Sequence, residues 1–100
     1  MFNLTQHTPT AEQIAAGVIE PDKETKREII ELMTFEDLPT QGEMERRAKG
    51  LAFLTSWRSA EKRALIGGAP FFMSTLERVL KGSGILPFHA FSVRDSVETP

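Results

Sequence analysis

Residues 63–77 read RALIGGAPFFMSTLE, and this stretch decides the fold. The apolar run at 64–66 stops at two glycines, and its shortness favours a buried strand over a helix. Pro70 suits the first position of the helix that we expect next, because the N–H that proline lacks would be unpaired there in any case. We expect Gly82 and Gly84 to end this helix. Its buried stripe should comprise Phe72, Met73, Leu76, Val79 and Leu80.

The next apolar run completes a strand–helix–strand unit. Residues 85–93, ILPFHAFSV, are rich in aromatic and branched side chains and predict a strand. Pro87 lies near its start, where a missing donor does least harm. Strands joined by a helix in this way are parallel, and the connection is right-handed. Neither apolar run alternates cleanly with polar residues, which is typical of a parallel sheet covered on both faces.

The first sixty residues predict one more strand and three helices. Residues 2–6, FNLTQ, predict a short strand. The first helix is expected between a cap at Thr8 or Thr10 and an end at Gly17. The second covers residues 22–33 with Asp22 as its cap, and the third covers residues 41–60 with Thr40 as its cap. The apolar positions of helix 41–60 are Met44, Ala48, Leu51, Ala52, Leu54 and Trp57.

This order of elements predicts an α/β fold. We expect a minimal Rossmann-like three-layer sandwich, in which a short parallel sheet of about three strands carries helices on both faces. The length of 100 residues fits a single domain over 1–100. An all-helical fold is the alternative, because so much of the chain has a helical pattern.

Composition excludes several classes of protein. The net charge of −2 argues against a basic protein that binds duplex nucleic acid directly. The absence of cysteine excludes a disulfide framework and a thiolate metal site, and it fits a cytoplasmic protein. We expect no signal peptide and no membrane span, since no apolar run approaches about 18 residues. His7 and His89 lack paired carboxylates nearby, so we expect no metal and no cofactor.

Polar residues follow each of the three predicted strands. Ligands of open parallel sheets bind beyond the carboxyl ends of the strands, so we expect these residues to share one edge. The predicted ligand-binding set is Asn3, Thr5, Gln6, His7, Gly67, Gly68, Ser92 and Arg94.

Several members of this set also have a plainer interpretation. The loop at Gly67 and Gly68 can hold an anion with its N–H groups and the following helix dipole, or it can simply permit a sharp turn. His7 can act as a general acid or base, stack on a base, or cap a helix. Arg94 can bind phosphate with its planar fork, or pair with a nearby carboxylate. The basic run at 45–49 is expected to be a solvated helix face.

Two segments resemble a known family. FNLTQHTPTAEQI, at 2–14, is similar to the opening of small CRISPR-associated Rossmann-like proteins of the ring-nuclease type, and the matching residues are Asn3, Thr5, His7, Thr8, Pro9 and Gln13. GGAPFFMS, at 67–74, resembles the glycine-glycine-x-x-x-Met stretch of CRISPR-associated sensor domains. The resemblance implies a homodimer that binds cyclic oligoadenylates and, in some members, cleaves them without a metal. Ala69 and Pro70 depart from that pattern, which has a polar residue and a lysine there.

Two functional hypotheses follow. The first is a cytoplasmic homodimer that binds a nucleotide or related phosphate ligand, and that senses or cleaves a cyclic oligonucleotide with His7 as the candidate catalytic residue. The second is a non-enzymatic regulatory or interaction module that uses helix 41–60 as its partner surface, because Leu51, Phe53, Leu54 and Trp57 cover more than one side of that helix. The chain can equally belong to an uncharacterised small bacterial or phage family that shares the fold alone.

Overall fold

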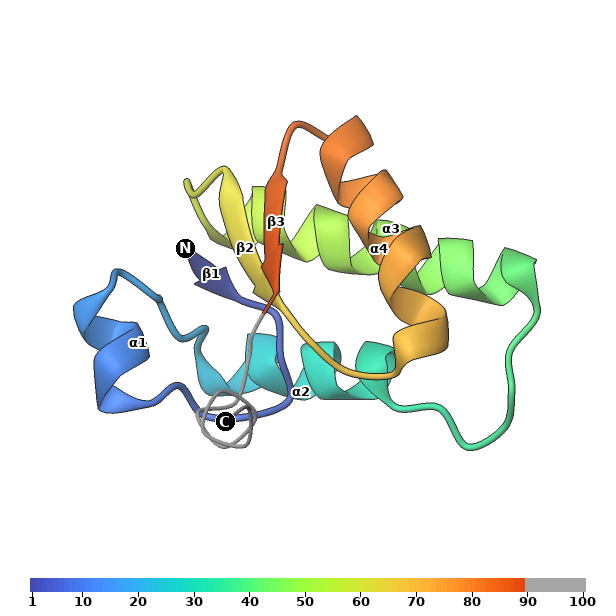
Figure 1. Ribbon diagram of the computed structural model, residues 1–100, viewed down its shortest axis with the longest axis horizontal. Helices are drawn as coiled ribbons and strands as arrows, with labels where there is room; N and C mark the ends of the chain where they lie inside the picture. The colour runs from blue at the N-terminus through green and yellow to red at the C-terminus, as the bar shows by residue number, and fades with distance from the viewer. Residues whose placement is uncertain (90–100) are drawn as a thin grey trace, which may run out of the picture.

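Three parallel strands form the sheet of the protein. The structure is a computed structural model and describes residues 1–89. The strands β1 (Phe2–Asn3), β2 (Arg63–Ile66) and β3 (Leu86–His89) lie in the order β1-β2-β3, and both neighbouring pairs are parallel (Figure 1). Phe2 pairs with Ala64, and Ala64 pairs with Pro87 on its other side. The predicted α/β fold with its parallel sheet is confirmed, and the all-helical alternative is wrong.

Four helices connect the strands. The helices α1 (Ala11–Ala15), α2 (Lys23–Met33) and α3 (Gln41–Arg58) lie between β1 and β2, and α4 (Pro70–Gly82) lies between β2 and β3. Their first turns follow from local chemistry, since the side chains of Thr10, Asp22 and Thr40 accept hydrogen bonds from N–H groups of the first turns. Of the two predicted caps of α1, Thr10 is the one used. Helix α4 instead starts at Pro70, without a side-chain cap.

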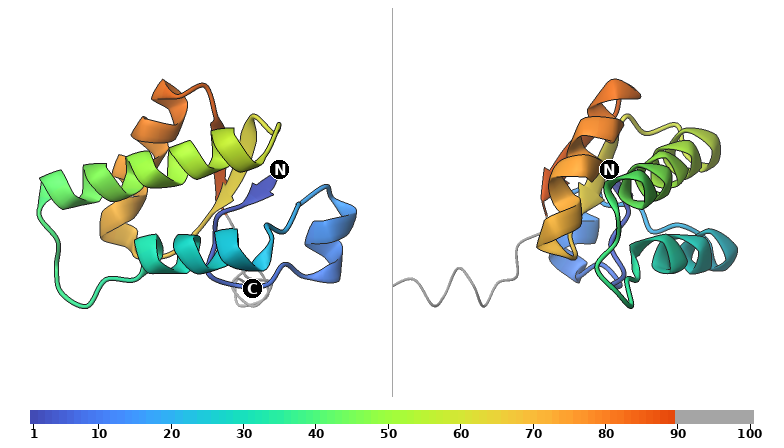
Figure 2. Two further views of the ribbon diagram at one scale, coloured as in Figure 1. Left: turned by 180° about the vertical axis from the view of Figure 1, so that it is seen from behind. Right: turned by 90° about the vertical axis from the view of Figure 1, so that its right-hand side faces the viewer.

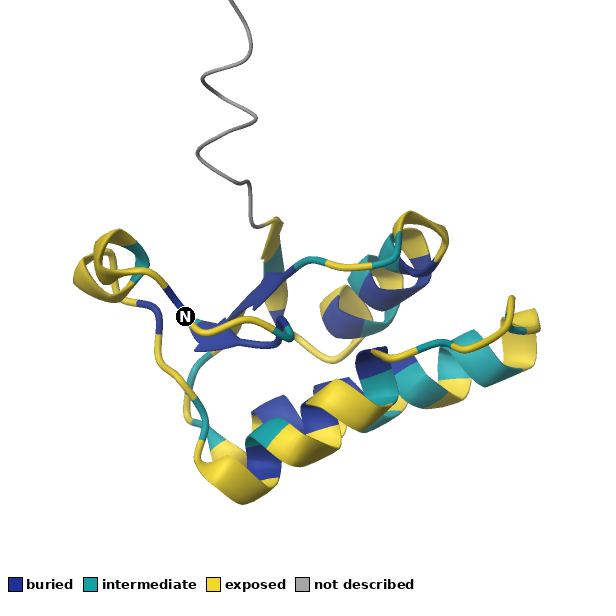
Figure 3. Cartoon of the chain, turned by 90° about the horizontal axis from the view of Figure 1, so that it is seen from below, coloured by how far each residue is buried: buried dark blue, intermediate teal, exposed yellow. Residues whose placement is uncertain are grey.

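The core lies on one face of the sheet. Successive residues of a strand point to opposite faces, so Phe2, Leu4, Ala64 and Ile66 share a side. They form one buried cluster with residues from α2, α3 and α4, namely Ile29, Met33, Ala48, Leu51, Ala52, Leu54, Phe72, Leu76 and Leu80, and with Ile85 before β3. The buried residues of these helices gather on the sides that face the sheet (Figure 3). The predicted stripes of α3 and α4 are therefore largely confirmed.

The opposite face of the sheet is more open. Helix α1 lies on the side of the sheet away from α3, beyond β1 (Figures 2 and 3), and none of its residues is buried. The side chains of Leu86 and Phe88 on β3 are 57% and 40% exposed. The described part of the strand predicted at 85–93 is present as β3, but it is only partly buried: Leu86 and Phe88 pair with Arg63 and Leu65 and so lie on the face opposite the core, whereas Ile85 is buried. Residues 90–93 lie outside the described residues.

The first strand is shorter than residues 2–6. The N–H of Leu4 still donates to the carbonyl of Leu65 at 2.9 Å, but the N–H of Thr5 donates to the side chain of Asn3 at 3.0 Å. This side-chain bond turns the backbone out of the sheet. Helix α3 also ends two residues before the predicted position 60. Within residues 1–89, no helix has the length and apolar character that a membrane span requires.

Candidate functional site

The strand exits meet at one edge, as the topology requires. Because β1 and β2 pair in parallel, residues 3–7 and Gly67–Gly68 leave the sheet at the same edge, and the end of β3 at His89 lies there too. Ser92 and Arg94 lie outside the described residues. The residues that follow the first two strands therefore share one edge of the sheet, as the predicted ligand site requires.

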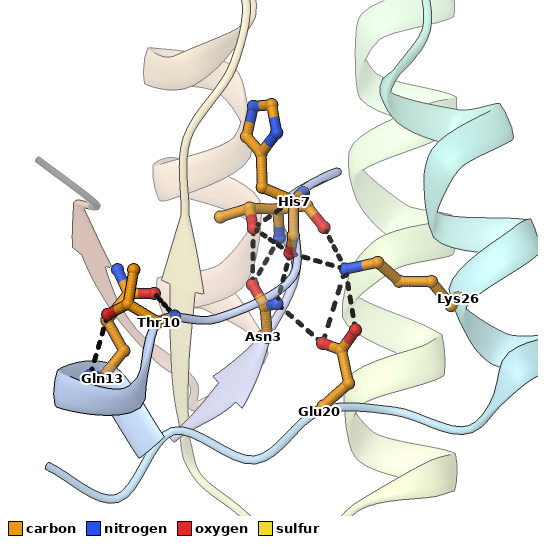
Figure 4. Close-up of polar contacts among 7 residues, drawn as sticks. Asn3, His7, Thr10, Gln13, Glu20 and Lys26 are labelled. Atoms are coloured by element: carbon orange, nitrogen blue, oxygen red, sulfur yellow. Dashed lines mark hydrogen bonds and ion pairs between the residues drawn. The ribbon is translucent and has the colours of Figure 1, made fainter. Parts of the chain in front are cut away.

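Asn3 is the centre of a polar network at this edge (Figure 4). Its side chain is fully buried. The amide nitrogen Nδ2 donates to the carbonyl oxygen of His7 at 2.9 Å and to Glu20 Oε1 at 2.7 Å. The amide oxygen accepts from the backbone N–H of Thr5 at 3.0 Å and from the Thr5 hydroxyl at 2.7 Å. An asparagine side chain has two N–H donors and two lone pairs, so Asn3 has no capacity left for a ligand.

Lys26 of α2 closes the network from the other side. Its Nζ donates to the carbonyl oxygens of Thr5 and His7, each at 2.9 Å, and lies 3.3 Å from Glu20 Oε2. All three donors of the ammonium group are therefore used. The sequence prediction missed both Lys26 and Glu20. A lysine early in a helix, where the dipole favours acidic residues, was the available signal.

Helix α2 runs along the whole carboxyl edge of β1 and β2. Lys26 contacts the β1 exit near its start, and beyond its end Thr34 Oγ1 accepts a hydrogen bond from Gln6 Nε2 at 2.9 Å. Gly68 has a φ of 149°, and a Cβ placed on it would lie 2.9 Å from Met33 Cε. The backbone angle favours glycine, whereas the contact with the flexible end of Met33 can be relieved by a movement of that side chain. The tight-turn interpretation of the Gly67–Gly68 loop therefore has direct support.

The imidazole of His7 points away from the network. Its carbonyl oxygen accepts from Asn3 and Lys26, while its ring has no hydrogen-bond partner among the described residues and is solvent-exposed (Figure 4). A general base is normally oriented by a second polar group, which this ring does not have in residues 1–89. His89 instead pairs with Glu77, with Nε2 and Oε2 2.9 Å apart on the surface. No group of three or more candidate metal ligands gathers within the described residues.

Two surface cavities lie on α2 and α3. A cavity of about 560 Å³ surrounds the α2–α3 connection, with Thr34, Leu38 and Arg47 in its lining. A groove of about 530 Å³ runs between the two helices and is lined by Glu28, Glu31, Leu32, Gly50, Phe53, Leu54, Trp57 and Arg58. Neither includes the predicted ligand-binding residues of the strand edge.

Phe53 and Trp57 form an exposed aromatic pair beside this groove. They lie one turn apart on α3, their rings stack with centroids 5.8 Å apart and an interplanar angle of 11°, and they are 61% and 71% exposed. Trp57, one of the predicted apolar positions of helix 41–60, therefore lies outside the buried side of the helix. The neighbouring Leu54 and Leu51 face the sheet instead, and α3 has more apolar residues than one side can hold. We call the groove and this pair the aromatic face.

Opposite charges flank the aromatic face. Glu28 and Glu31 belong to α2, while Arg46, Lys49 and Arg58 lie on α3, and all five are exposed. The one close pair across the groove joins Arg58 Nη2 and Glu28 Oε2 at 3.9 Å, at the surface. Such an exposed pair contributes little to stability, so these groups remain available to a partner.

Comparison with known proteins places the chain in one family. A family model described as Uncharacterized protein MJ1673 family matches residues 1–100. This description names neither a CRISPR-associated nor a Rossmann-fold family. No curated protein and no solved structure matches the chain.

Proposed function

We propose that this chain, which belongs to the MJ1673 family of uncharacterized proteins, is a non-enzymatic interaction module that binds an amphipathic helix of a protein partner along the aromatic face. The observation that carries the proposal is the stacked, exposed pair of Phe53 and Trp57 beside the groove between α2 and α3. Scattered exposed apolar residues are ordinary on protein surfaces. Two stacked aromatic rings at the edge of a groove are the kind of anchor that dominates binding at protein interfaces.

The shape and chemistry of the face suit a helix. Amphipathic helices dock into apolar grooves with anchors that recur every three or four residues. The floor formed by Leu32, Gly50 and Leu54 is apolar, and charged residues border it on both sides. Burial of one aromatic side chain contributes about 1.5–3 kcal/mol, so two such anchors supply a substantial part of the free energy of a micromolar complex, about −8 kcal/mol.

A second candidate function is the binding of a nucleotide or related phosphate ligand at the strand edge, including the sensing or cleavage of a cyclic oligonucleotide. It is supported by the shared edge of β1 and β2, and by α4, whose first turn lacks a side-chain cap. Asn3, Thr5 and Gln6 support it less, because their side chains already bond within the chain. A thermal-shift screen against mono-, di- and cyclic nucleotides tests it, since a tight ligand raises the melting temperature.

Site-specific photo-crosslinking tests the interaction proposal. A photoreactive residue at Ser56, which is exposed beside Trp57, should cross-link to a protein partner in cells, and Trp57→Ser should remove the adduct. The same group at Ser83, exposed after α4, is the matched control position. Equal yields from positions 56 and 83, or an adduct that is indifferent to Trp57→Ser, would contradict the proposal.

A further inference from the structure

We propose that the helix bound by the aromatic face is α3 of a second copy of this chain, packed antiparallel across a two-fold axis. This inference rests on the proposed function and identifies its partner. Its basis is the order of exposed side chains along α3, together with the charges that α2 places beside them.

The exposed residues of α3 form one line with two chemically distinct halves. Arg46, Lys49, Phe53 and Trp57 are all exposed and recur at intervals of three or four residues. The half toward the start of the helix is cationic, and the half toward its end is aromatic. Because α3 has 18 residues, the line extends over most of a helix of about 27 Å.

An antiparallel two-fold axis makes this line complementary to itself. In such an interface each contact occurs twice, with the roles of the two copies exchanged. An axis level with residues 51–52, the middle of this line of side chains, sets Arg46 of one copy against Trp57 of the other, and Lys49 against Phe53. Cations over aromatic faces attract, and Arg over Trp is a favourable combination. Parallel packing would instead bring like charges together.

The acidic residues of α2 fit the same arrangement. Glu28 lies level with the end of its own α3, where its carboxylate is 3.9 Å from the guanidinium of Arg58. The two-fold axis carries the cationic half of the other copy, with Arg46 and Lys49, to this end of the groove. Glu28 and Glu31 of one copy therefore face the cationic half of α3 in the other copy. Binding of an unrelated partner would not require that the charged and aromatic residues of this face complement one another.

A stable dimer needs a minimum of buried surface. A standard interface buries about 800 Å² on each partner, roughly a tenth of the surface of a small protein. This chain exposes 6470 Å², and α2 and α3 together offer a face about 27 Å long. In this arrangement Lys49 and Phe53 lie nearest the two-fold axis, and Arg46 and Trp57 lie toward the two ends of the interface.

Sedimentation of the purified full chain tests the inference. We expect a concentration-dependent shift from a monomer of 11.2 kDa to a dimer, with at least about a tenfold rise in Kd for Trp57→Ser. Arg46→Glu should weaken the dimer, and adding Glu28→Lys in the same chain should restore it, since the charges then exchange places. Leu38→Ser, at a position that is 81% exposed and outside the aromatic face, should leave the dimer unchanged. Circular dichroism confirms that each variant is folded.

The outcomes separate this inference from the function on which it rests. A chain that stays monomeric at about 100 µM, a hundred times a micromolar Kd, overturns the self-association. So does a dimer that is indifferent to Trp57→Ser, or an Arg46→Glu defect that Glu28→Lys does not restore. If the chain is monomeric while position 56 cross-links to a different protein, the interaction module stands with another partner. If no adduct forms either, both proposals fail.

Discussion

Replacement of Asn3 by alanine should cost stability rather than ligand binding. The change removes four hydrogen bonds around a fully buried side chain. It leaves the buried N–H of Thr5 without its acceptor and the Thr5 hydroxyl with only its longer bond to the carbonyl oxygen of His7 at 3.2 Å, and an unsatisfied buried group costs about 1–3 kcal/mol. We therefore expect Asn3→Ala to lower the free energy of unfolding by about 2–4 kcal/mol, a large share of the roughly 5–15 kcal/mol of a typical domain.

Urea unfolding followed by far-ultraviolet circular dichroism measures this loss. In Asn3→Asp the aspartate side chain has nearly the same shape as asparagine, but a carboxylate oxygen replaces the amide nitrogen. That nitrogen lies 2.7 Å from Glu20 Oε1, so the new carboxylate faces the carboxylate of Glu20. Burial and this like charge raise the pKa of the introduced carboxyl in the folded state, so the folded chain binds a proton more readily than the unfolded chain. Asn3→Asp should consequently gain stability as the pH falls from neutral, relative to Asn3→Ala. A loss below about 0.5 kcal/mol for Asn3→Ala would refute the reasoning, because surface substitutions alone give changes of that size.

Three further changes test other parts of the structure. Arg47 donates to the carbonyl oxygens of Glu31, Leu32 and Thr34 at the end of α2, and its guanidinium lies over the ring of Phe35. Arg47→Lys keeps the charge but loses the planar fork. This change should lower the free energy of unfolding in urea by about 1–3 kcal/mol. Gly68→Ala should cost about 1–3 kcal/mol in the same assay, since it forces alanine into a strained φ of 149°, and an unfolding free energy equal to that of the parent chain would show that the loop relaxes freely. The hydrogen bond from the Thr25 N–H lowers the pKa of the Asp22 carboxyl below 3.8. The stability that this cap adds is therefore present above the unfolded-state pKa and is lost as the pH falls through the folded-state pKa. Thermal melts of Asp22→Ala and the parent chain should differ at neutral pH and converge in acid.

Local chemistry made much of the fold predictable. Asp22, Thr40 and Pro70 mark helix starts because their capping or backbone properties act within one turn, and these positions needed no knowledge of the rest of the chain. The parallel direction of β2 and β3 followed from the helix between them, because a helical crossover joins parallel strands. The length of β1 was less predictable, because a hydrogen bond to the side chain of Asn3 ends it.

The candidate site was harder to predict, because its contacts join distant parts of the chain. Lys26 and Glu20 meet the β1 exit only after α2 has folded across the sheet edge, and no local pattern marks that approach. The exposure of Trp57 has a similar cause. The periodicity of α3 shows that its apolar residues cover more than one side, but packing against the sheet decides that Leu54 is buried and Trp57 is not. Side chains that looked like ligand contacts in the sequence, above all Asn3, instead hold the chain to itself.

Trp57 also provides the most direct measurement of the central claim, that the aromatic face binds a second copy of the chain. It is the only tryptophan in the sequence, and it is 71% exposed in the single chain, so quenching of its fluorescence by acrylamide reports on this face alone. We predict that quenching weakens and the emission shifts to shorter wavelength as the protein concentration rises through the Kd of the dimer. Quenching that stays equally strong at every concentration, while sedimentation shows dimer in the same samples, would contradict the claim, because the dimer would then leave the aromatic face open.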